Sequence, residues 1–129
     1  MTRYLDTTFL IDLLRGIPAA VQKSNRFKDA GEVLAVPAPC IAELVRGLAR
    51  TSRRSRGAAE ALLAQLDVGP LDSAAARRAG TVAAETARRG DEVSMVDCLV
   101  AGVVLEGDGT LVTRDADFGR MPGLSVETY

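Results

Sequence analysis

The chain alternates short apolar segments with longer helix-like segments, and this alternation restricts its fold more than any other feature. The short segments are expected strands and lie at 3–5, 33–36, 68–71, 110–113 and 124–127. A strand followed by a helix and then by another strand is typical of a parallel sheet with helices on both faces. We therefore expect an α/β fold, a three-layer α/β/α sandwich, in which residues 1–129 form a single domain.

The helix-like segments lie at 9–16, 18–31, 41–50, 58–66, 73–89 and 94–106. Thr7 or Thr8 can cap the first of them, and Pro18 suits the start of the second. The last segment is apolar almost all round, so we expect it to be central and buried. The stretch rich in arginine and serine at 50–57 is expected to be a loop or hinge.

Acidic residues stand at expected strand or helix ends, in a chain that has no histidine. They are Asp6, Glu43, Asp97, Asp115 and Asp117. Carboxylates among apolar neighbours are costly unless a positive charge compensates them, and ligands of parallel sheets bind at the carboxyl ends of the strands. Without histidine, an oxygen-preferring cation such as Mg²⁺ or Mn²⁺ is the natural partner. The pattern therefore indicates a metal-dependent enzyme that cleaves phosphodiester bonds.

Each acid also has an ordinary structural interpretation. Asp6 could cap a helix, Glu43 could favour the dipole of a first helical turn, and Ser94 with Asp97 fits a capping box. The remaining two aspartates could solvate a turn. The acids are more informative together, because carboxylates that cluster without a cation repel one another.

Charge is unevenly distributed in a chain whose formal net charge is −1. Residues 46–57 contain several arginines and no acid. This run is either a solvated helix end and loop, or a contact for phosphates or for an acidic segment of a partner protein. The candidate contact residues are Arg46, Arg50, Arg53 and Arg54.

The cysteines and the apolar segments indicate a cytoplasmic protein. Cys40 and Cys98 lack the spacing of a metal site, and no secretory signal precedes them, so we expect both to be reduced core residues. The longest apolar run, at 98–105, is far shorter than the ~20 residues needed to cross a bilayer. We expect no membrane association.

Four fragments, in this order and at these separations, resemble the PIN-domain family, in particular the ribonuclease toxins of VapC-type toxin–antitoxin pairs. The fragments are LDTTFLID at 5–12, IAELVRG at 41–47, VSMVD at 93–97 and LVTRDADF at 111–118, with MPGL at 121–124 behind them. The sequence departs from the family pattern at Ala38 and Cys40, where small hydroxyl residues are common. It departs again after Asp97, where alanines are more usual.

The resemblance implies a five-stranded parallel sheet and an acidic site that is dependent on Mg²⁺ or Mn²⁺. It places Asp6, Glu43 and Asp97 in the site, with Asp115 as the fourth acid and Asp117 as the alternative. Thr7 and Thr113 would support these acids through hydrogen bonds.

The resemblance also implies the partners. The substrate would be RNA, either tRNA or another structured RNA. A cognate antitoxin would bind the toxin and could inhibit it by inserting an arginine among the carboxylates. We further expect a homodimer, a hetero-oligomer with the antitoxin, and contact with operator DNA only through the antitoxin.

Other functions compete with this interpretation. The chain could be a PIN nuclease of RNA maturation or of DNA, or a non-catalytic module that binds an antitoxin or another partner. Two other acidic-site folds fit poorly. A haloacid-dehalogenase-type phosphatase would need an acid where Thr8 stands, and a response-regulator receiver would need a late lysine, whereas Lys23 and Lys28 are the only lysines.

Overall fold

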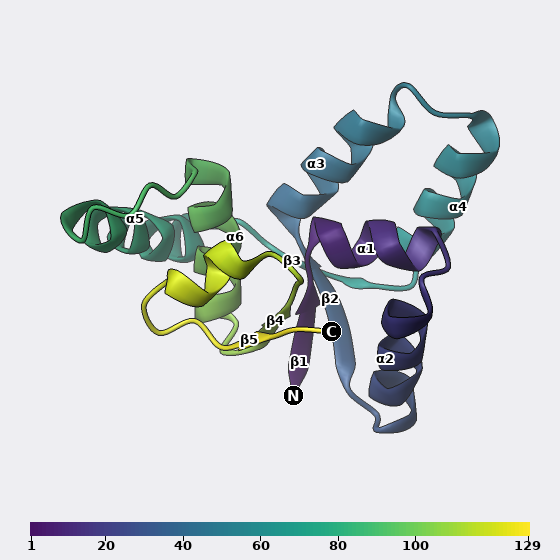
Figure 1. Cartoon of the computed structure of the whole chain (residues 1–129), viewed down its shortest axis with the longest axis horizontal. Helices are drawn as coiled ribbons and strands as arrows, with labels where there is room; N and C mark the ends of the chain where they lie inside the picture. The colour runs from purple at the N-terminus through teal and green to yellow at the C-terminus, as the bar shows by residue number, and fades with distance from the viewer.

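The computed structural model describes all 129 residues and has a five-stranded sheet at its centre, with every neighbouring pair of strands parallel (Figure 1). The strand order is β3-β2-β1-β4-β5. The strands are β1 (Thr2–Leu5), β2 (Val33–Pro37), β3 (Asp67–Gly69), β4 (Thr110–Val112) and β5 (Val126–Glu127). The predicted parallel sheet of five short strands is confirmed.

Helices cover both faces of this sheet, which gives the predicted three layers. Figure 1 shows α1 and α2 on one side of the sheet and α5 and α6 on the other, with α3 and α4 extending beyond its upper end. The helices are α1 (Thr7–Leu14), α2 (Pro18–Asp29), α3 (Ala38–Leu48), α4 (Arg53–Leu63), α5 (Ser73–Arg88) and α6 (Met95–Glu106). A 3₁₀ helix, η1 (Ala116–Arg120), precedes the last strand.

The first strand is central, and its carboxyl end organises the site. Leu5 of β1 lies opposite Val112 of β4, and both side chains are fully buried. Asp6 continues this pairing, since its backbone N–H donates to the Val112 carbonyl oxygen at 3.3 Å. The residues that follow β1 and β4 therefore meet at one edge of the sheet.

As predicted, α6 is the buried central helix. It packs beside β2 and β4 and lies against α5. The two helices approach closely at Gly102, where an added Cβ would lie 2.3 Å from the Ala75 carbonyl oxygen. Only a glycine permits this contact without a shift of one helix.

Among the helix boundaries, two starts differ most from the predictions. The stretch expected to be a loop at 50–57 is largely the first turn of α4, which begins at Arg53. Ser52 explains the earlier start, because its Oγ accepts the backbone N–H of Ser55 at 3.1 Å and arginine is a good helix former. The next correction concerns α3, which begins at Ala38 rather than at residue 41, because Pro39 is tolerated in a first turn. No helix is both long and apolar enough to cross a membrane.

Candidate metal centre

Carboxylates of three aspartates converge at the carboxyl edge of the sheet. Asp97 in the first turn of α6 faces Asp115 and Asp117, and one oxygen from each lies within 4.8 Å of the others. The Ser94 hydroxyl caps α6 by accepting the backbone N–H of Asp97 at 3.1 Å. This is the first half of the predicted capping box, and it fixes the start of the helix that carries Asp97.

Asp97 is in an unfavourable electrostatic setting. Burial raises its pKa above the ordinary value of 3.8, and the charges of Asp115, Glu43 and Asp117 raise it further, while the Ser94 hydrogen bond lowers it. The like charges that raise this pKa are the charges that a bound cation would compensate.

Asp6 lies beside this group and is held by three hydrogen bonds. Its Oδ1 accepts the Thr8 hydroxyl at 2.7 Å and the Phe9 backbone N–H at 2.9 Å, so Asp6 is the N-cap of α1. Its Oδ2 accepts the Thr113 hydroxyl. Burial raises the pKa of Asp6 and the Asp115 charge adds to this, against the three hydrogen bonds, which lower it.

Thr113 connects Asp6 to the aspartates after β4. Its hydroxyl donates to Asp6 and accepts the backbone N–H of Asp115 at 3.0 Å. Asp115 Oδ1 in turn accepts the backbone N–H of Asp117 at 2.9 Å. This buried threonine therefore fixes the turn that presents both aspartates.

Glu43 approaches from α3. It lies in the second turn rather than the predicted first turn, because α3 begins early. Its Oε1 accepts the Thr7 hydroxyl at 3.0 Å, and its charge raises the pKa of Asp97. Glu43 therefore borders the group of three without joining it.

The arginines differ in how firmly they are held. The four candidate contact arginines are exposed along the stretch from the last turn of α3 to the first turn of α4: Arg46, Arg50, Arg53 and Arg54. Arg54 lines a groove of about 420 Å³ between α1, α3 and α4. None of these four forms an ion pair within the chain. Arg120, in contrast, bonds Asp117 at 2.6 Å and lies 3.7 Å from Asp91.

Sequence reasoning missed a second polar cluster near this edge, formed by Asp12, Arg114 and Tyr129. The carboxylate of Asp12 is buried and accepts Arg114 Nε at 2.8 Å and the Tyr129 hydroxyl. The available signal was an acid within the apolar run of residues 9–14, which requires a partner when the helix is buried. The partners lie more than 100 positions away in the sequence.

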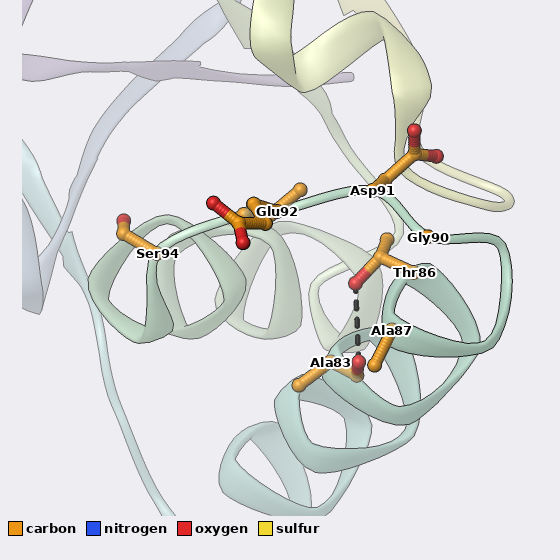
Figure 2. Close-up of a pocket in the computed structure, with 8 residues that line it drawn as sticks. Ala83, Thr86, Ala87, Gly90, Asp91, Glu92 and Ser94 are labelled. Carbon is orange, nitrogen blue, oxygen red and sulfur yellow. Dashed lines mark hydrogen bonds between the residues drawn. The ribbon is translucent and has the colours of Figure 1, made fainter.

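A depression of about 740 Å³ lies elsewhere, where α5 turns into α6 (Figure 2). Its Thr86 hydroxyl donates to carbonyl oxygens of its own helix, at 3.0 Å to Val82 and 3.1 Å to Ala83. The Asp91 carboxylate points away from the other lining residues (Figure 2) and lies near Arg120. This depression lacks converging polar groups, so we place the chemistry at the carboxylates.

The carboxylate group suits a divalent cation. It offers oxygen ligands alone, at an edge where burial, and to a lesser degree neighbouring negative charge, raises the pKa values of Asp6 and Asp97. Mg²⁺ and Mn²⁺ prefer carboxylate and water oxygens, and they need no histidine. The residues therefore fit such an ion.

Comparisons with known proteins agree with the fold. Residues 3–124 match the PIN domain family. Over 128 residues the chain is 30% identical to the tRNA(fMet)-specific endonuclease VapC of Shigella flexneri, and the match covers 97% of this chain and 96% of that protein.

Two solved toxin–antitoxin complexes contain a similar chain. The DNA-bound VapBC of Salmonella typhimurium matches with a TM-score of 0.88 at 26% identity, covering 99% of this chain and 98% of that one. VapBC2 of Rickettsia felis, bound to a fragment of its promoter, matches with a TM-score of 0.92 at 19% identity, covering 100% and 99%. The chain therefore belongs to the PIN-domain family, and within it to the VapC-type ribonuclease toxins.

Proposed function

We propose that the chain is an endoribonuclease toxin of a type II toxin–antitoxin pair, which requires Mg²⁺ or Mn²⁺ and hydrolyses phosphodiester bonds in tRNA or another structured RNA. The observation that carries this proposal is the convergence of Asp97, Asp115 and Asp117 beside Asp6. The activity would reside in a single domain of residues 1–129 and would be exerted in the cytoplasm, where its substrate is found.

We assign the following roles to the acids. Asp6, Asp97 and Asp115 hold the cation, and Asp117 is the alternative to Asp115 as the fourth acid. Glu43 binds the cation or orients the attacking water. When bound, the cation supplies charge neutralisation at the scissile phosphate and lowers the pKa of water.

Two hydroxyls keep the acids in position. Thr113 fixes Asp6 and the backbone of Asp115, and Thr7 fixes Glu43. Hydrogen bonds of this kind orient metal-binding carboxylates and maintain their basicity.

The substrate class rests on the relative from Shigella flexneri, which is named a tRNA(fMet)-specific endonuclease. A role in RNA maturation or on DNA is not favoured, because the similarity to that relative extends over almost the full length of both chains.

Cleavage of a total tRNA pool tests the proposal. The purified chain is incubated with Mn²⁺ or Mg²⁺, or with EDTA, beside an Asp6→Asn variant of equal thermal stability. Asp108→Asn, a change at an exposed residue away from the carboxylates, is the control. We expect metal-dependent cleavage by the parent and the control, and loss of cleavage in Asp6→Asn. Equal rates for Asp6→Asn and the parent would contradict the carboxylate mechanism. A folded, metal-binding parent that cuts no RNA would favour the non-catalytic, partner-binding alternative.

The proposed protein partner is a cognate antitoxin, as in the similar complexes. The groove between α1, α3 and α4 suits a segment of such a protein, since Leu44, Leu48 and Glu43 are among its lining residues. Arg54 also lines it, and Arg46, Arg50 and Arg53 are exposed along the stretch from the last turn of α3 to the first turn of α4. All four arginines are available for RNA or for acidic antitoxin residues. Operator DNA would be contacted only through the antitoxin.

An arginine of the antitoxin, inserted among the carboxylates, would compete with the cation. Titration of Mn²⁺ into the free toxin and into the complex measures this competition. We expect weaker binding in the complex, and equal affinities would refute the inserted arginine.

A homodimer is also proposed. An apolar depression of about 460 Å³ lies between α3, the start of α6 and the segment after β3, with Leu71, Val96 and Leu99 in its lining. Leu71 and Val96 are 39% and 40% exposed. Exposed apolar surface of this kind favours contact with a second protein surface.

A further inference from the structure

Arg114 is an arginine fixed by a buried partner beside the candidate metal centre. It directly follows Thr113 and precedes Asp115, so its backbone belongs to the turn that presents the aspartates. Its Nε donates to Asp12 at 2.8 Å, and its Nη2 lies at 3.5 Å from the other oxygen of the same carboxylate. The Asp12 side chain is only 8% exposed, whereas that of Arg114 is 53% exposed.

Asp12 also has a second partner. The Tyr129 hydroxyl donates to the oxygen that receives Arg114 Nε, and the Tyr129 ring packs edge-on against Phe9 at 4.8 Å between centroids. Arg114 and Tyr129 together outweigh burial and keep the pKa of Asp12 below its usual range, so the anchor stays charged.

Asp12 therefore binds one edge of the Arg114 guanidinium, through Nε and Nη2, and leaves Nη1 available to a ligand. If Arg114 served only to neutralise the buried carboxylate of Asp12, half of its own side chain would not need to be exposed. Arg120, the other paired arginine at this edge, is bonded to an Asp117 side chain that is 55% exposed, and such a pair is weakly held. Arg114 is therefore the better preorganised cation.

From this geometry, and resting on the proposed function, we propose that Arg114 binds a phosphate of the RNA substrate next to the scissile position. A polyanion that approaches three clustered carboxylates is repelled by them, and a fixed cation in the same turn offsets that repulsion. A guanidinium matches a phosphate in shape and hydrogen bonding. Asp12 and Tyr129 are positioning residues, because they act through Arg114.

RNA binding in EDTA tests this role without cleavage. Labelled total tRNA is titrated with the parent, Arg114→Gln, Arg114→Lys and the double variant Asp12→Asn/Tyr129→Phe at several KCl concentrations. Arg88→Gln, at the exposed end of α5, is the control.

We expect Arg114→Gln to weaken tRNA binding on the order of tenfold at low salt and to lower the slope of log affinity against log salt by about one. Arg114→Lys keeps the positive charge, so it should have the slope of the parent. Its affinity should stay below that of the parent, because lysine lacks the planar guanidinium. The double variant keeps the positive charge of Arg114 but removes the groups that position it, so it should keep the slope and lose affinity. Arg88→Gln should match the parent.

The outcomes separate this inference from the proposed function. A parent that cuts and binds tRNA while Arg114→Gln keeps its affinity and slope would overturn the role of Arg114 alone. The same result with reduced affinity for the antitoxin would assign Arg114 to the protein partner instead. A folded parent that neither binds nor cuts tRNA would overturn the proposed function, and this inference with it.

Discussion

At the scale of single residues, the Thr113 hydroxyl donates to Asp6 and accepts the Asp115 backbone N–H. One substitution can remove this hydroxyl while keeping the packing of the side chain. Thr113→Val keeps the shape and removes the hydroxyl that bonds Asp6 and the Asp115 backbone. We expect a loss of about 1–3 kcal/mol in the free energy of unfolding, because buried polar partners are left unpaired. Affinity for Mn²⁺ should fall by ~10- to 100-fold. Urea denaturation and calorimetric titration measure the two effects. Thr113→Ser, which keeps the hydroxyl, should retain most of both, and an unchanged valine variant would show that the hydroxyl is dispensable.

Asp97 makes a pH-dependent contribution to stability, because burial and neighbouring charges raise its pKa above 3.8. A carboxyl group with a raised folded-state pKa holds its proton more tightly in the folded protein. Its stabilising contribution is therefore present below 3.8 and is lost as pH rises through the raised pKa. The free energy of unfolding of Asp97→Asn, minus that of the parent, should increase across this window. Urea denaturation in EDTA at a series of pH values measures this difference, and a flat or falling difference would contradict the prediction.

The candidate site could be anticipated from sequence wherever local position was informative. Asp6 and Asp97 lie at helix starts. Ser94 caps α6 as the sequence indicates, whereas Asp6 itself caps α1 in place of Thr7 or Thr8. The structure brings Asp97 together with Asp115 and Asp117. The catalytic roles of these acids stay predictions. The cluster of Asp12, Arg114 and Tyr129 was not anticipated, because its pairing depends on tertiary contacts rather than on spacing.

At the scale of secondary-structure elements, the contact between α5 and α6 depends on Gly102. Gly102→Ala would place a Cβ 2.3 Å from the Ala75 carbonyl oxygen, so the helices must separate. We expect destabilisation by about 1–3 kcal/mol, even though alanine is intrinsically favoured over glycine in a helix by about 1 kcal/mol. Gly80→Ala, on α5, meets nothing within 4 Å and should stabilise instead. Thermal unfolding of both variants checks the opposite signs, and equal shifts would show that the close approach is unimportant.

The order of the strands and helices could be predicted from the sequence, whereas their first and last residues could be predicted less accurately. Alternating strands and helices predicted the parallel layers because each short apolar segment needs cover on both faces. The start of α4 was missed since arginines were interpreted as loop residues, although Ser52 supplies a cap. The start of α3 lies before residue 41 because Pro39 is tolerated in a first helical turn.

At the scale of the whole molecule, the exposed apolar depression between α3 and the start of α6 leads to a prediction about the oligomeric state. Leu71→Arg places a charge in its lining, so the proposed homodimer should dissociate into monomers. Light scattering coupled to size-exclusion chromatography measures the mass of each variant. Val33→Arg changes an apolar residue that is 45% exposed and lies outside the lining of this depression, so its mass should equal that of the parent. A Leu71→Arg variant that remains dimeric would place the interface on another face.

Because β1 pairs with β4, the site can form only after β4 has been synthesised. Asp6 is made early, but the hydroxyl that holds it belongs to Thr113, 107 positions later, and Asp115 and Asp117 come later still. A ribosome adds residues from the amino end, so the growing chain lacks its acidic cluster until the residues after β4 have been added. Under the proposed function, a nascent polypeptide that has not reached this point is harmless to the translating ribosome and its tRNAs. Toxicity then arises only after β4 and the turn behind it have been made, when an antitoxin already present can capture the chain.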